Sequence, residues 1–317
     1  MSGISFDNRV VIITGGGGAI GRACALEIAR RGGSVVVNDL GGEVSGGGAS
    51  TSYADAVVDE IRAAGGTAVA SYDNVGTLAG ARNIAAAALD NFGRIDGLMN
   101  NAGNMRCGSF EALDEDDLQA VLQVHLVGSF NLSQAVWPHM RSQGYGRIVF
   151  TSSGAGVLGH PTYAAYGAAK AGMMGLMNTL ALEGAAHGIL CNGLLPNAAS
   201  RMTRAVSTLR RGEAPPPPGP HMALIAPTMQ AEFMMGIGVY LASEACTTTH
   251  ALYSSLGGRI ARAFVGVTEG WYGPTDQGAS PDDIAAHIDL IRDTGDFHIP
   301  AGLGEEYEIV GRALAKA

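Results

Sequence analysis

The chain has 317 residues, of which 47% are hydrophobic and 15% are charged, and its formal net charge is −9 at pH 7. This length allows one large domain or two small ones, and the composition is typical of a compact globular protein. The acidic balance argues against a nucleic-acid surface, which needs a basic stripe. No apolar run reaches the roughly 18 residues of a membrane span. The first residues also lack the layout of a signal peptide, so we expect a cytoplasmic protein without nucleic-acid or membrane partners.

The four cysteines are widely separated in the sequence and form neither a CxxC motif nor a Cys/His ligand spacing: Cys24, Cys107, Cys191 and Cys246. In a reducing compartment such cysteines are free thiols. The pattern therefore predicts no disulfide and no metal site.

Short apolar segments alternate along the chain with longer segments of helical period. The expected strands are residues 9–14, 34–39, 67–73, 95–101, 147–153 and 189–196, and the expected helices are residues 19–32, 77–92, 114–141 and 162–186. Strands that are apolar on both faces indicate a parallel sheet covered on both sides. The fold class predicted is α/β, a doubly wound parallel sheet of the Rossmann type.

Three stretches do not follow this alternation. Residues 41–52 form a Gly/Ser loop, residues 210–222 contain four successive prolines that favour an extended conformation, and the tail begins near Gly257. Ser280 and Pro281 with an acidic first turn predict a helix over 280–293. We expect one dinucleotide-binding domain over 1–256, including a substrate loop at 200–226, with a C-terminal extension at 257–317 packed on it.

A glycine-rich turn, TGGGGAIG at 14–21, links the first strand to the first helix. Glycines there let the backbone approach a pyrophosphate, and the helix N-terminus offers N–H groups to its charge. Asp39 ends the second strand, 24 positions after Gly15, which is close to the spacing at which an acid accepts the ribose hydroxyls of NAD. Such an acid repels the additional phosphate of NADP, and the pattern therefore favours NAD.

Further polar residues follow the third and fourth strands: Asp73, Asn74 and Asn100, with the NAG segment 101–103 that contains Ala102. In doubly wound sheets ligands collect outside these carboxyl ends. Taken singly, a residue of this kind is more often a turn former than a ligand contact.

The segment YAAYGAAKAG places two tyrosines before one lysine, with Tyr166 four residues and Tyr163 seven residues ahead of Lys170. A phenol with a pKa near 10 is a poor base, and a lysine one helical turn away is expected to lower that pKa toward neutrality. Ser153 ends the fifth strand, 13 positions before Tyr166. A serine there could bind a substrate oxygen while the tyrosine removes its proton.

These motifs together resemble the short-chain dehydrogenase/reductase family, and the resemblance extends over nearly the whole chain. Within the family, the stretches VVVNDLGG, SYDNV, VHLVGSF and PNAASRMT are most similar to (3R)-hydroxyacyl-CoA and 17β-hydroxysteroid dehydrogenases. The resemblance implies that Ser153, Tyr166 and Lys170 are catalytic, and that Lys170 also binds the nicotinamide ribose. It also implies a homodimer or homotetramer.

The resemblance further implies the set of cofactor-binding residues: Gly15, Gly17, Gly18, Ile20, Gly21, Asp39, Asp73, Asn74, Asn100, Ala102, Tyr166, Lys170, Pro196 and Asn197. Two positions depart from the family pattern. Ala19 replaces a fingerprint glycine, and His125 replaces the asparagine of a proton relay. We interpret His125 either as a catalytic residue that anchors water or as a hydrogen-bonded helix histidine.

The leading hypothesis is an NAD-dependent enzyme that oxidises the secondary hydroxyl of a small-molecule substrate. The resemblance implies a 3-hydroxyacyl-CoA or a hydroxysteroid, and another bulky apolar alcohol stays open. Residues 104–110 and 204–226 differ most from the similar enzymes and are expected to form the substrate wall. Arg201, Arg204, Arg210 and Arg211 could bind CoA phosphates or could form a solvated basic face. The alternative hypothesis is a dinucleotide-sensing protein without turnover.

Overall fold

The computed structural model describes residues 3–213, 217 and 219–315. The chain divides into two compact units, residues 1–262 and residues 263–317. This boundary lies six residues beyond the one expected from the sequence, because the strand that follows Gly257 and Gly258 belongs to the main sheet. Ala214–Pro216 and Pro218, which make up much of the proline-rich segment, lie outside the described residues.

An eight-stranded sheet with the order β3-β2-β1-β4-β5-β6-β7-β8 forms the centre of the first unit. The strands are β1 (Val10–Thr14), β2 (Ser34–Asn38), β3 (Thr67–Ser71), β4 (Gly97–Asn100), β5 (Gly146–Thr151), β6 (Ile189–Pro196), β7 (Ala251–Leu256) and β8 (Arg259–Ala263). The pairs from β3 to β7 are parallel. Gly257 and Gly258 join β7 to β8 with φ angles of 65° and 78°, so they form a two-residue hairpin turn and β8 is antiparallel. The predicted doubly wound sheet is confirmed.

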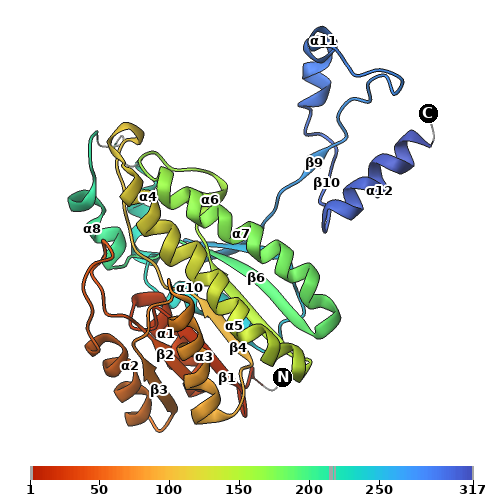
Figure 1. Ribbon diagram of the computed structural model, residues 1–317. Coiled ribbons are helices and arrows are strands. Elements are labelled where there is room, and N and C mark those ends of the chain that lie inside the picture. Colours follow the sequence, from red (N-terminus) through yellow and green to blue (C-terminus); the bar gives the residue numbers. More distant parts are fainter. Residues whose placement is uncertain (1–2, 214–216, 218, 316–317) are drawn as a thin grey trace. The chain divides into compact units, whose positions relative to one another are not determined.

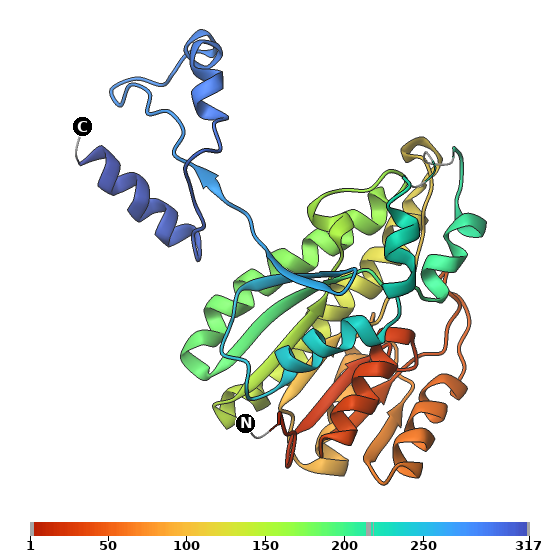
Figure 2. The ribbon, with the colours of Figure 1, turned by 180° about the vertical axis from the view of Figure 1, so that it is seen from behind.

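Helices cover both faces of this sheet (Figures 1 and 2). They are α1 (Ala19–Arg30), α2 (Ser52–Ala63), α3 (Leu78–Phe92), α4 (Glu115–Leu122), α5 (Gly128–Gln143), α6 (Gly154–Val157), α7 (Ala164–Gly184), α8 (Arg201–Leu209), α9 (Met222–Ile225) and α10 (Glu232–Ala242). Figure 1 looks onto α4, α5 and α7, whereas Figure 2 looks onto the opposite side with α1 and α10. Every residue of β1, β4 and β5 is therefore buried, as expected for parallel strands.

The strand order fixes where a ligand can bind. The chain winds outward from β1 through β2 to β3 and then returns to β4 on the other side of β1. The carboxyl ends of β1 and β4 consequently lie side by side, with their following loops diverging. Open α/β sheets bind ligands in the crevice at such a switch point.

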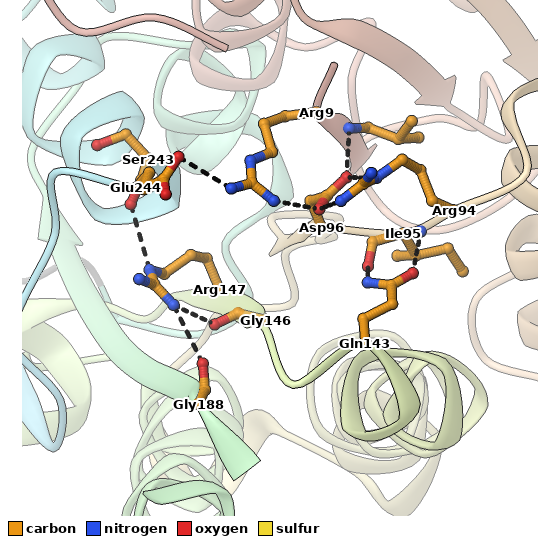
Figure 3. A network of polar contacts seen from close by, with 11 residues as sticks. Arg9, Arg94, Ile95, Asp96, Gln143, Gly146, Arg147, Gly188, Ser243 and Glu244 are labelled. Atoms are coloured by element: carbon orange, nitrogen blue, oxygen red, sulfur yellow. Dashed lines mark hydrogen bonds and ion pairs between the residues drawn. The ribbon is translucent and has the colours of Figure 1, made fainter. Parts of the chain in front are cut away.

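The opposite edge of the sheet carries an ion-pair network (Figure 3). Asp96, which is 2% exposed, accepts hydrogen bonds from Arg9 at 2.9 Å and from Arg94 at 2.7 Å, and also from the Val10 N–H. The guanidinium groups of Arg9 and Arg147 lie over the ring of Tyr145, at 4.1 and 4.3 Å from its centroid. These residues lie at the amino ends of β1, β4 and β5, away from the carboxyl ends where ligands bind. The network therefore stabilises the fold and takes no part in ligand binding.

The structure contains elements that the alternation did not predict: α2, α6, α8, α9, α10, β7 and β8. The expected helix 114–141 consists of α4, a π-helical turn over Gln123–Val127, and α5. All four cysteines are free, and all four are buried. Among the described residues no single helix is long and apolar enough to span a membrane, although α9 and its extension to Thr228 pass that test together with α10 as a bent pair.

The second unit contains α11 (Pro281–Ile291), α12 (Leu303–Leu314) and the antiparallel pair of β9 (Val267–Thr268) and β10 (Phe297–His298). The helix predicted at 280–293 is confirmed, with Ser280 as its N-cap, because the Asp283 N–H donates to the Ser280 hydroxyl at 3.2 Å. Trp271 stacks on His287, and Phe264 stacks on Phe297. No described residue of this unit is fully buried. Whether it packs on the first unit stays a prediction.

Candidate active site

The glycine-rich turn requires its glycines. Gly15 has a φ of +60°, and a side chain there would lie 2.9 Å from the Cα of Ala102. A side chain at Gly21 would overlap the carbonyl oxygen of Gly15. Gly18 is the N-cap of α1 and supplies no capping side chain, so the first N–H groups of the helix are available to an anion. The turn therefore fits the pyrophosphate of a dinucleotide.

Asp39 lies where the sequence predicted an acid, directly after β2, and is buried. One of its oxygens accepts the Gly17 N–H at 3.0 Å and the other accepts the Gly41 N–H at 2.8 Å. These bonds fix the carboxylate beside the glycine turn. A carboxylate has about four acceptor sites, so two hydrogen bonds leave capacity for ribose hydroxyls.

Asn101 connects the two strands at the switch point and was missed as an individual residue. Its side-chain N–H donates to the Thr14 carbonyl at 2.9 Å and to that of Gly15 at 3.2 Å. The Thr14 hydroxyl accepts the backbone N–H groups of Asn101 and Ala102 at 3.0 Å. The sequence signal that could have identified Asn101 is the NAG segment at 101–103 together with Thr14, which precedes the glycine turn. Asn101 thus holds the loop after β4 against the cofactor turn.

A cavity of about 400 Å³ lies beside the first turn of α1. It is lined by Ala19, Arg22, Ala199, Arg204, Gln230, Ala231 and Glu232. Ala19, which replaces a fingerprint glycine, is exposed there. The loop after β6, which contains Asn197, therefore borders the same crevice as the glycine turn.

The other predicted cofactor residues are placed as follows. Asp73 accepts from the side chain of Asn83 at 2.9 Å, and the Asn74 side chain accepts the Gly76 N–H at 2.8 Å, so both shape the turn before α3. Asn100 is buried and donates to Ser133 on α5 at 3.2 Å. Ile20 lies half-buried in the first turn of α1, Pro196 ends β6, and the exposed Asn197 donates its backbone N–H to Ser255.

Ser153, Tyr166 and Lys170 converge at the carboxyl edge of β5. Ser153 is the N-cap of α6, and its hydroxyl accepts the Ala155 N–H at 3.1 Å. Tyr166 and Lys170 occupy adjacent turns of α7, and the Lys170 nitrogen lies over the Tyr166 ring at 5.6 Å from its centroid. Lys170 is 3% exposed and donates to the Thr151 carbonyl at 2.5 Å.

Burial dominates the protonation of both α7 residues. It raises the pKa of Tyr166 to about 12, against a lowering effect of the hydrogen bond with Ser153. Burial also lowers the pKa of Lys170 to about 7. The expectation that Lys170 would bring the phenol toward neutrality was wrong, because desolvation of the two groups outweighs the attraction between their charged forms. The protonated phenol and a neutral amine are thus favoured above neutral pH.

His125 lies in the π-helical turn and is 1% exposed. Its Nε2 contacts the Asn104 carbonyl at 2.9 Å and the Asn104 N–H at 3.2 Å, whereas its buried Nδ1 has no hydrogen-bond partner in the described part of the chain. Its ring packs edge-on against Tyr166 at 5.3 Å. Burial, assisted by Lys170, holds the pKa of His125 well below its usual range, so the imidazole is neutral. His125 is thus a hydrogen-bonded helix histidine, which is the second of the two interpretations, and its ring also contacts Tyr166.

An apolar cluster surrounds Tyr166. It consists of Met105, Cys107 and Val206, with Val44, Tyr163, Met202 and Leu209 packed against them. The two segments expected to form the substrate wall are thereby brought together. Tyr163 stacks on His160 at 4.1 Å and contacts Tyr166 edge-on at 5.8 Å. Tyr163 therefore packs in the wall.

The sequence of the chain is similar to those of known dehydrogenases. A family model described as short chain dehydrogenase matches residues 9–213. A short-chain type dehydrogenase/reductase of Mycobacterium tuberculosis is 42% identical over 286 residues, which is 90% of this chain and 94% of that protein. Peroxisomal multifunctional enzyme type 2 of Mus musculus is 44% identical over 261 residues, which is 82% of this chain and 33% of that enzyme.

Among solved structures, full-length peroxisomal multifunctional enzyme type 2 from Drosophila melanogaster is similar, with a TM-score of 0.79 and 29% identity. The alignment covers 99% of this chain and 50% of that one. The chain therefore spans a third to a half of these multifunctional enzymes and nearly all of the mycobacterial relative.

Proposed function

Because this chain belongs to the short-chain dehydrogenase/reductase family, whose Rossmann fold implies a nicotinamide dinucleotide, we propose that it is an NAD-dependent oxidoreductase. It interconverts a secondary alcohol and a ketone, and the substrate is a 3-hydroxyacyl-CoA or a hydroxysteroid of the 17β type. The observation that carries this proposal is the convergence of Ser153, Tyr166 and Lys170 at the carboxyl end of β5, two strands from β1 and its glycine-rich turn.

Each residue of the trio has a distinct task. Ser153 donates a hydrogen bond to the substrate oxygen and holds it near the phenol. In the oxidation direction Tyr166 accepts the hydroxyl proton, and in the reduction direction its protonated phenol donates that proton to the carbonyl oxygen. Lys170, held by the Thr151 carbonyl one turn from Tyr166, keeps its nitrogen beside the phenol and would bind the nicotinamide ribose. The nicotinamide, when bound, accepts or supplies the hydride.

The preference for NAD is proposed from Asp39. Its carboxylate is fixed beside Gly17 at the position where the adenosine ribose lies in dinucleotide-binding folds. A buried anion there binds ribose hydroxyls and repels a phosphate ester.

The substrate class is proposed from the wall around Tyr166 and from the relatives. Met105, Val206 and Leu209 offer an apolar surface to an acyl chain or a steroid.

The relatives named multifunctional enzyme are peroxisomal. A cytoplasmic location of this chain stays a prediction. We also propose a homodimer or homotetramer, supported by exposed Phe130 and Leu182 on α5 and α7, and light scattering tests it.

The test is a substrate panel that follows absorbance of NADH. The panel contains 3-hydroxyacyl-CoAs of both configurations, 17β-hydroxysteroids and simple secondary alcohols, each with NAD and with NADP. We expect turnover with NAD on at least one of the first two classes. NAD binding without turnover on any alcohol would instead favour the alternative, a dinucleotide-sensing protein.

A further inference from the structure

Three buried polar side-chain atoms without a partner belong to residues on the segments that meet at Cys107–Gly108, beside the apolar cluster. They are Nε of Arg106, Oγ1 of Thr162 and Nε of Arg210, and none has a hydrogen-bond partner within residues 3–213, 217 and 219–315. Burying a donor without a partner is destabilising, and more so for a charged group. Three such atoms on three neighbouring segments therefore indicate a place built for hydrogen bonding with a ligand.

The contacts between these segments bring the three residues to one place. The Gly108 N–H donates to the Thr162 carbonyl at 2.9 Å, and the Arg211 N–H donates to the Cys107 carbonyl at 3.0 Å. The Cys107 thiol lies 3.7 Å from the Val206 carbonyl oxygen. Arg210 is the C-cap of α8, and its N–H donates to the carbonyl of Val206 at 3.1 Å. Val206 belongs to the apolar cluster against which Tyr166 packs. The place is consequently next to the catalytic tyrosine.

Thr162 supplies an independent observation. It is a β-branched residue with a φ of +71°, in the left-handed region that such side chains rarely occupy. Strain of this kind persists where the surroundings impose it, and it clusters at ligand sites. The segment that contains Thr162 leads directly into α7 and Tyr166.

The local charges leave a guanidinium in excess. Arg211 is paired with Asp114 at 2.7 Å and with the buried Asp117 at 3.0 Å. Arg106 reaches Asp117 only at 3.7 Å, and Arg210 makes no ion pair among the described residues. Arg201, at the start of α8, stacks over Tyr53 at 4.1 Å. Of the four arginines considered for phosphate binding, Arg204 and Arg210 thus make no ion pair among the described residues, and Arg210 is the one next to the apolar cluster, through its bond to Val206.

We propose that Arg106, Thr162 and Arg210 form a subsite for an anionic oxygen group of the substrate, a carboxylate or a phosphate. Guanidinium and hydroxyl donors suit both groups. The inference rests on the proposed oxidation of a secondary alcohol and specifies which alcohols are taken. It predicts that charged substrates are preferred to neutral ones of the same carbon chain.

The test compares three substrates with one chain: 3-hydroxyoctanoyl-CoA, free 3-hydroxyoctanoate, and the uncharged N-acetylcysteamine thioester. In Arg210→Gln we expect KM to rise roughly ten- to hundredfold for a charged substrate, with little change in kcat or in KM for the neutral thioester. A rise of KM for 3-hydroxyoctanoyl-CoA indicates that the subsite binds a phosphate, and a rise for 3-hydroxyoctanoate indicates that it binds a carboxylate. Arg82→Gln, which removes an exposed arginine of α3, is the control and should match the unmodified enzyme.

An equal rise of KM for the neutral thioester, or no rise for either charged substrate, would overturn the subsite while leaving the dehydrogenase proposal standing. If the unmodified protein oxidises none of the three, the dehydrogenase proposal fails for this substrate class. Calorimetric titration with CoA and with octanoate then tests the subsite alone, since binding should be present and weakened by Arg210→Gln. Should that variant not fold, Thr162→Val, which keeps the shape and removes the hydroxyl, must raise the same KM selectively.

Discussion

The amine nitrogen of Lys170 lies 5.6 Å from the centroid of the Tyr166 ring while its hydrogen bond goes to the Thr151 carbonyl. The lysine is thus anchored to the end of β5 and faces the tyrosine from a fixed distance. Both groups are desolvated, so their pKa values shift in opposite directions, to about 12 for the phenol and about 7 for the amine. This arrangement favours the uncharged form of each partner.

Removing the phenol oxygen should abolish turnover. We expect Tyr166→Phe to reduce kcat by about a thousandfold or more, because it deletes the general acid–base, while NAD still binds. Tyr163→Phe is the matched control, since Tyr163 packs in the wall at 5.8 Å from Tyr166, and it should keep most of the rate. Initial rates and fluorescence titration with NADH measure the two properties. Equal losses in both variants would remove Tyr166 from its assigned role.

The rate of alcohol oxidation should increase with pH. Since the pKa of Tyr166 is raised to about 12, the phenolate fraction grows through the range from pH 7 to pH 10. Ketone reduction uses the protonated phenol and should not gain over the same range. A profile of kcat/KM against pH in both directions checks this. A plateau for oxidation that begins below pH 7 would contradict it.

Lys170 should lower the stability of the folded protein at neutral and acidic pH. Its pKa is about 7 when folded, against 10.5 as the ordinary value, so the unfolded chain binds more protons between these pH values. Stability therefore rises as pH increases from 7 to about 10, and the cost, on the order of 5 kcal/mol, is complete below pH 7.

We therefore expect Lys170→Met to be inactive and yet more stable at pH 6, by about 3 kcal/mol after loss of the hydrogen bond to Thr151. The gain should disappear near pH 10. Urea unfolding at several pH values measures it, and Arg82→Met should show no such dependence. A destabilised Lys170→Met at pH 6 would mean that the hydrogen bond outweighs the desolvation.

Asp39 should control the choice of cofactor. Asp39→Ala removes the carboxylate held by Gly17 and Gly41, and we expect weaker NAD binding and at least tenfold less discrimination against NADP. Asp90→Ala, which changes an exposed acid of α3, serves as the control. The measurement is the ratio of the dissociation constants for NAD and NADP, in each variant and in the unmodified protein. An unchanged ratio would assign the preference to other residues.

Asp96 should contribute to stability without contributing to turnover. Asp96→Asn leaves the guanidinium groups of Arg9 and Arg94 without their buried carboxylate, and we expect a loss of about 3 kcal/mol. Because Asp96 lies at the amino edge of the sheet, kcat of the folded fraction should be unchanged. Thermal unfolding and activity at low temperature separate the two effects. A lowered kcat in the folded protein would connect this edge to the active site.

The sequence sufficed for the features that depend on local pattern. Apolar periodicity predicted the six central strands. The glycine turn, Asp39 and the Tyr166–Lys170 pair were recognisable from their spacing, and the structure places them after β1, after β2 and on α7. The pKa shifts were not predictable, because burial of Lys170 depends on how the loop after β5 covers it. Asn101 was missed as an individual residue because its bonds to Thr14 and Gly15 cross 86 or more positions of sequence. The approach of α8 to Cys107 is likewise a tertiary contact without a local signal.

The π-helical turn at Gln123–Val127 lies between α4 and α5 and shifts the rotational register of one relative to the other. Before it, the helix follows the cap at Asp114, and within it His125 is turned toward Tyr166. After it, Leu132, Val136 and Met140 face the core at intervals of four residues. One residue corresponds to about 100° of rotation in an α-helix. A chain shortened by one residue between Asp114 and Gly128 could keep the imidazole against the phenol or the apolar stripe against the sheet, but not both.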